Sequence, residues 1–235
     1  MACFVLVHGA FHGGWCWSRV AAILRRDGHD VFTPTQTGLG ERRHLLSADI
    51  KLDTFVTDIC EVLETEELTD VVLVGHSFGG ISITGAADRM PERIRRLVYL
   101  DSRILENGQS MLDVDPQRSG AWTRAAEAHG GLALSPPDPA YFGLTDPADL
   151  QWVQRRLTPH PLGTFTSALH LRHPVGNGIL CTYVPCVDPL YAPLQVCREW
   201  ARGRPGWDEQ PIATGHDAMV SAPEELAGIL TRIAA

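Results

Sequence analysis

The sequence lacks the features that mark a membrane-spanning, nucleic-acid-binding or exported protein. No apolar run reaches the roughly 18 residues that a membrane-spanning helix needs. The formal net charge is −8, and the densest basic cluster is Arg93, Arg95 and Arg96, so we expect neither nucleic acid nor a membrane as a partner. The six cysteines form no C-x-x-C pair, and the N-terminus has no signal-peptide pattern. We therefore expect reduced thiols in a cytoplasmic protein with a small-molecule ligand.

Cofactor-binding patterns are also missing. Neither the dinucleotide loop G-x-G-x-x-G nor the phosphate loop G-x-x-x-x-G-K-[ST] occurs. His8 and His12 are four residues apart, but they lie in a glycine-rich loop rather than on a helix, which disfavours a metal site. We expect no cofactor and no metal. A homodimer is compatible with the sequence, which does not fix the oligomeric state.

The chain does contain an alternation of short β-branched runs and amphipathic helical patterns over its 235 residues. This alternation predicts a single α/β domain with a mostly parallel sheet covered by helices on both faces. We expect six strands, at residues 3–7, 30–33, 71–74, 97–100, 182–186 and 209–213. The first two helices are expected after the N-caps Ser18 and Asp53.

Residues 105–172 interrupt the alternation. They hold seven prolines around two helical patterns, at residues 120–129 and 148–157. The insertion is too short and too often broken by proline to build a core of its own. We expect a helical cap at residues 105–172 on a core formed by residues 1–104 and 173–235.

The most informative motif is VVLVGHSFGG at residues 71–80. A strand that turns into a helix at G-x-S-x-G is typical of a nucleophile elbow, in which a strained backbone exposes the serine at the sheet edge. The motif follows an apolar strand and precedes a helical pattern, as the elbow requires. We therefore predict that Ser77 is a nucleophile.

A serine hydroxyl needs a base to take its proton. Of the five histidines after Ser77, His216 lies between the last expected strand and the last expected helix, at the same edge of the sheet as Ser77. The other four lie in the cap or its return, at His129, His160, His170 and His173. His216 is the expected base.

Two aspartates end strands where they would reach His216. Asp188 follows the strand before His216 and is the preferred acid, whereas Asp101 ends the strand after the elbow and remains an alternative. An oxyanion hole is expected from the amides of Phe78, next to the nucleophile, and of Ala10, in the loop after the first strand.

These segments together resemble the α/β-hydrolase superfamily, in the small cap-bearing branch of methylesterases, salicylic-acid-binding esterases and hydroxynitrile lyases. The resemblance covers nearly the whole chain and is weakest over the cap. It is carried by FVLVHGAFHGGWCW, PTQTGLGERRHLL, VVLVGHSFGG, LVYLDS and ATGHDAMVSAPEELA. It implies an α/β-hydrolase fold with Ser77 as nucleophile, His216 as base and Asp188 as acid. The interval of 28 residues from Asp188 to His216 (216 − 188) fits that placement.

The branch includes several chemistries. Its hydroxynitrile lyases carry a threonine and a lysine where this chain has Gly9 and Asp217, and an anionic Asp217 disfavours cyanide chemistry. We expect a serine esterase that cleaves small carboxylic esters through an acyl-enzyme. A carbamate or amide hydrolase and a non-catalytic small-ligand binder remain alternatives.

Two features bear on the substrate. Cap aromatics predict an apolar pocket, unless they only pack the cap onto the core. Cys16 is expected to be a buried filler rather than a residue that tunes the site. The cap aromatics are Trp122, Tyr141, Phe142, Trp152 and Phe165.

Overall fold

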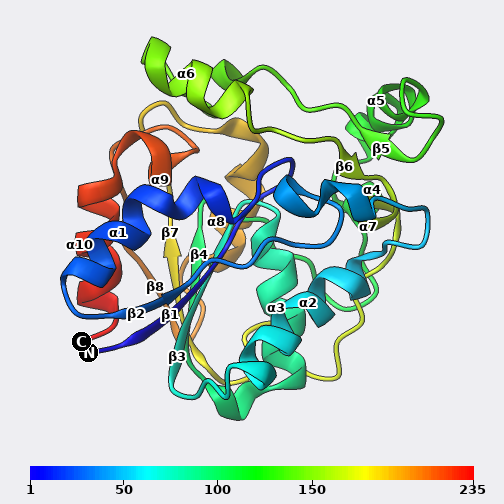
Figure 1. Ribbon diagram of the computed structural model, residues 1–235. Helices are drawn as coiled ribbons and strands as arrows, with labels where there is room; N and C mark the ends of the chain where they lie inside the picture. Colours follow the sequence, from blue (N-terminus) through cyan, green and yellow to red (C-terminus); the bar gives the residue numbers. More distant parts are fainter.

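A six-stranded parallel sheet forms the centre of the protein, in the strand order β2-β1-β3-β4-β7-β8 (Figure 1). The computed structural model describes residues 1–235, with all side chains except those of Gln117 and Ser119. The predicted α/β-hydrolase architecture is confirmed. The strands are β1 (Cys3–Val7), β2 (Asp30–Phe32), β3 (Val71–His76), β4 (Ile94–Leu100), β7 (Leu180–Val184) and β8 (Trp207–Glu209).

Helices cover both faces of the sheet, because the central strands are apolar on both sides. Every residue of β3 is buried, and alternate residues belong to two separate cores. Val74 packs in the core beneath α1 and α10, whereas Leu73 packs in the core beneath α2 and α3. The α-helices are α1 (Ser18–Arg26), α2 (Leu52–Thr65), α3 (Gly79–Arg89), α4 (Met111–Val114), α5 (Pro116–Glu127), α6 (Pro147–Gln154), α7 (Gly163–Thr166), α8 (Gln195–Ala201), α9 (Ala218–Ser221) and α10 (Pro223–Ile233).

No helix in the described part of the chain combines the length and apolar character needed to cross a bilayer. Short 3₁₀ turns join several elements. They span Gly14–Trp17, Gly40–Leu45, Pro91–Arg93, Pro139–Phe142 and Ala192–Leu194.

Three local expectations were wrong. Ser18 does not cap α1, because the preceding 3₁₀ turn already gives Trp17 a helical backbone and Ser18 becomes the first helical residue. Asp53 lies inside α2, where the Lys51 amide donates to the Thr54 hydroxyl at 3.1 Å. The last strand ends at Glu209 rather than continuing to residue 213, although an isolated bridge between Ile212 and Cys186 follows it, with the Ile212 amide donating to the Pro185 carbonyl at 3.0 Å.

Residues 105–172 lie over the edge of the sheet at which its strands end, with α5 and α6 farthest from the sheet (Figure 1). They include α4 to α7 and a small antiparallel pair, β5 (Ala133–Leu134) with β6 (His160–Pro161). Leu134 and Phe165 belong to the core beneath α2 and α3. The segment therefore packs onto the main core rather than around one of its own.

Candidate active site

The turn from β3 into α3 holds Ser77 in a left-handed backbone conformation, with φ of 52°. Strand and helix approach so closely that a side chain would not fit at the flanking glycines. A Cβ atom at Gly75 would lie 2.7 Å from the Gly79 carbonyl oxygen, and one at Gly79 would lie 2.6 Å from the His8 carbonyl oxygen. The G-x-S-x-G spacing thus reflects the steric demands of this turn, and the turn has the strained form expected of an elbow.

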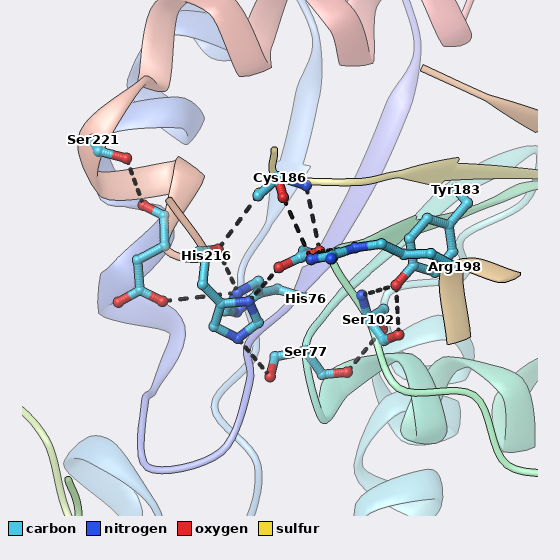
Figure 2. Close-up of polar contacts among 10 residues, drawn as sticks. His76, Ser77, Ser102, Tyr183, Cys186, Arg198, His216 and Ser221 are labelled. Carbon is cyan, nitrogen blue, oxygen red and sulfur yellow. Dashed lines mark hydrogen bonds and ion pairs between the residues drawn. The ribbon is translucent and has the colours of Figure 1, made fainter. Parts of the chain in front are cut away.

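Ser77 and His216 meet at the edge of the sheet (Figure 2). The Ser77 hydroxyl donates to Nε2 of His216 at 2.9 Å. The opposite ring nitrogen, Nδ1, donates to Oδ2 of Asp101 at 2.6 Å. Asp101 is fully buried and His216 is only 2% exposed. Three side chains from distant segments therefore form one continuous hydrogen-bonded chain.

The preference for Asp188 as the partner of His216 was wrong. Asp188 lies in the loop after β7 and its side chain is exposed to solvent, while Asp101, the alternative, contacts the imidazole. The register of the sheet explains the difference. His76 is paired with Leu100, so Asp101 follows directly beside Ser77, whereas β7 lies one strand farther from β3.

Donors surround the second oxygen of Asp101. Its Oδ1 accepts from Arg198 at 2.6 Å and 3.2 Å and from the Cys186 amide at 3.3 Å. These contacts fix the orientation of the carboxylate. Arg198 lies in α8, far along the chain, and no spacing pattern in the sequence pointed to it.

The ring of His216 is held from several sides. Tyr191 stacks on it with centroids 4.1 Å apart, and Nε2 of His76 donates to its main-chain carbonyl at 3.0 Å. Burial, followed by the nearby His216, lowers the pKa of His76 well below its ordinary value, so His76 stays neutral.

A second buried pair lies beside the base. Nδ1 of His12 donates to the Ala10 carbonyl at 2.8 Å, and its Nε2 donates to Oδ2 of Asp217 at 3.1 Å. A ring that donates through both nitrogens is an imidazolium. Burial lowers the pKa of His12, but the charge and hydrogen bond of Asp217 outweigh it, so the pKa is raised overall. Sequence reasoning missed this pair, although both residues border predicted motifs.

The two residues whose amides are expected to form an oxyanion hole lie at the same cavity as Ser77. Ala10 and Phe78 both line it. Neither amide donates a hydrogen bond to another group in the described part of the protein. The Ala10 carbonyl accepts from His12, which anchors the loop after β1.

The cavity over Ser77 has a volume of about 250 Å³. Four of the five cap aromatics line it, namely Trp122, Tyr141, Phe142 and Phe165. Trp152 instead packs edge-on against Trp15, with ring centroids 5.1 Å apart. The cavity therefore has a partly aromatic wall, to which Arg103 and Arg118 add positive charge.

Two of the histidines that were set aside as the base, His160 and His173, do not line the cavity. His160 is buried and accepts from the Phe11 amide, while His173 pairs with Asp88 at 3.1 Å near the surface. Among the described residues, no group of three or more His, Cys, Asp or Glu side chains is arranged to hold a metal ion. Cys16 is buried and does not line the cavity.

Comparisons with known proteins agree with this fold. A sequence model described as "Alpha/beta hydrolase family" matches residues 4–229. The "Carbendazim hydrolyzing esterase" of Nocardioides sp. (strain SG-4G) is 41% identical over 97% of both chains. Methylesterase 10 of Arabidopsis thaliana is 29% identical over 99% of this chain and 91% of its own. A solved extracellular alpha/beta-hydrolase from a Paenibacillus species superposes with a TM-score of 0.86 at 23% identity, covering 99% and 98% of the two chains.

Proposed function

The chain belongs to the alpha/beta hydrolase family and is a carboxylic ester hydrolase, and we propose that it cleaves small esters with Ser77, His216 and Asp101 as its catalytic triad. The observation that carries this proposal is the unbroken chain of hydrogen bonds from Ser77 Oγ through both His216 nitrogens to Asp101. It supplies a nucleophile, a base with a free lone pair and a carboxylate that orients the base.

In the first half of the reaction, Ser77 Oγ attacks the ester carbonyl while Nε2 of His216 takes its proton. The amides of Ala10 and Phe78 hold the oxyanion of the tetrahedral intermediate. His216 then protonates the departing alcohol, which leaves an acyl group on Ser77. In the second half, His216 takes a proton from water, the hydroxide attacks the acyl carbonyl, and the proton returns to Ser77 as the acid departs.

The test is hydrolysis of 4-nitrophenyl acetate by wild type and by Ser77→Ala. We expect the variant to lose a factor on the order of 10³ or more in kcat with its fold intact, because the nucleophile is gone. Wild-type protein that binds esters without a burst or turnover would favour a non-catalytic binder instead.

A carbamate substrate is a second candidate, because the 41% identical relative is a carbendazim hydrolyzing esterase. A panel of aryl acetates, methyl esters, carbamates including carbendazim, and cyanohydrins separates these options. We expect no cyanohydrin cleavage, since Asp217 places a carboxylate beside His216 and pairs with His12.

Three broader features remain proposals. The division into a core and a cap at residues 105–172 is supported by the packing of that segment over the cavity. A cytoplasmic location is supported by six free cysteines. We propose a small ester as the ligand. Sedimentation would test for a homodimer.

A further inference from the structure

Arg198 is a buried arginine whose side chain lies near Cys186 and His216 (Figure 2). Its side chain is only 4% exposed and pairs with a fully buried Asp101. Asp101 therefore lies between two groups, with the guanidinium on Oδ1 and the His216 ring on Oδ2. Nη2 of Arg198 also reaches the Cys186 carbonyl at 3.4 Å, which ties the arginine to the chain just beyond β7.

The charge balance around the pair of Asp101 and His216 gives Arg198 a role beyond packing. A fully buried carboxylate needs a compensating cation, and the positive charge of Arg198 supplies it. The same charge disfavours a second positive charge on the nearby imidazole.

The other ionisable groups around the pair do not supply this cation. Burial raises the pKa values of Tyr183, Cys186 and Tyr191 and lowers that of His76, which keeps these four groups neutral. Asp217, on the other side of His216, is paired with His12.

We propose that Arg198 is a positioning residue of the triad, which fixes Asp101 and balances its charge so that His216 remains a neutral base at lower pH than it otherwise would. This inference rests on the proposed function. It also explains how the acid can work from a site with no access to water, since Asp101 has the hydrogen bonds and the countercharge that it needs within the protein.

The test is the pH profile of kcat/KM for 4-nitrophenyl acetate in wild type, Arg198→Met and Arg198→Lys. Removing the positive charge favours uptake of a proton by the pair of Asp101 and His216. The acid limb of the Arg198→Met profile should therefore move to higher pH, by about one unit or more. Lysine retains the charge, so its limb should stay in place while kcat falls. A limb that moves in both variants, or in neither, overturns the proposal.

Arg96→Met is the control for loss of an arginine–aspartate pair away from His216, because Arg96 pairs with Asp208 at 2.7 Å, in a more exposed position toward the start of β4. It should leave the profile unchanged. Arg198→Gln removes the charge but keeps hydrogen-bonding groups, and it carries the same expectation if the methionine variant does not fold.

Titration of the His216 ring by NMR gives a readout that needs no turnover. We expect its midpoint to rise in Arg198→Met by the same amount as the kinetic limb. If the wild type shows no ester hydrolysis that depends on Ser77, the proposed function is overturned. If the titration midpoint of His216 does not move in Arg198→Met, the role of Arg198 is overturned.

Discussion

The ends of β4 and β7 carry two aspartates with opposite surroundings. Asp101 follows β4, is fully buried and accepts hydrogen bonds on both oxygens. Asp188 follows β7 by a few residues and points into solvent. Both are strand-end carboxylates in the same parallel sheet, and both fit the chain order of a triad. The difference teaches that the carboxylate that pairs with His216 is selected by its neighbours, Arg198 on one oxygen and His216 on the other, rather than by its place in the sequence.

The test with the largest expected effect on kcat replaces each aspartate by asparagine. We expect Asp101→Asn to lower kcat on the order of 10³-fold, because an amide can favour the wrong tautomer of His216 and cannot stabilise the imidazolium. Asp188→Asn should stay within about twofold of wild type, since no contact with the triad is lost. The measurement is ester hydrolysis with circular dichroism to check the fold. Equal losses in both variants would remove the distinction between the two strand ends.

The sequence predicted the sheet, the elbow and His216 because each depends on local pattern. Ser77 is identified by the glycines that the turn requires, and His216 by its place between the last strand and the last helix. The choice between Asp101 and Asp188 depends instead on strand register and on burial, which no spacing encodes. Arg198 could not be predicted, because no local pattern marks it and its partner lies 97 residues away in the chain.

His216 also lies next to a second buried carboxylate, Asp217, which is engaged by His12 rather than by the base. The raised pKa of His12 means that the folded state holds this proton more tightly than the unfolded chain. The pair therefore stabilises the fold fully below about pH 6.5, the ordinary value for histidine, and loses this contribution as pH rises through the higher folded-state pKa.

Asp217→Asn tests this second pair. We expect a loss of about 2 kcal/mol in the free energy of unfolding at pH 6, because a charged hydrogen bond is removed, and a smaller loss at pH 9. Turnover should fall by about tenfold, since the loop after β1, which carries Ala10, is anchored through His12. Denaturant unfolding at both pH values measures the first effect. A loss that grows with pH would contradict an imidazolium at His12.

Two tryptophans in residues 105–172 offer a parallel contrast. Trp122 lines the cavity and meets Phe165 edge-on at 5.1 Å, whereas Trp152 lies outside it between Arg19 and Arg156. Both lie in expected helical patterns, so composition predicted an aromatic pocket without saying which side chains form it. Only the fold of the proline-rich segment separates them.

Trp122→Ala should raise KM for aryl esters by about tenfold with kcat nearly unchanged, which corresponds to the loss of one aromatic contact. Trp152→Ala is the matched control and should leave KM within about twofold. Michaelis–Menten kinetics on 4-nitrophenyl acetate and 4-nitrophenyl butyrate measure both. A rise in KM for Trp152→Ala alone would place the aryl group outside the cavity.

The smallest effect is expected at Cys16, which is buried in the 3₁₀ turn that follows the loop after β1. Burial raises the pKa of its thiol well above the ordinary value, so no thiolate forms at neutral pH to act as a nucleophile. Cys16→Ser should keep kcat within about twofold of wild type and cost about 1 kcal/mol of stability, because a hydroxyl replaces a thiol in apolar surroundings. Kinetics and thermal unfolding measure the two effects. A large loss of turnover with an unchanged melting temperature would mean that the Cys16 side chain assists the reaction directly. Cys16 would then not be a residue that is only buried.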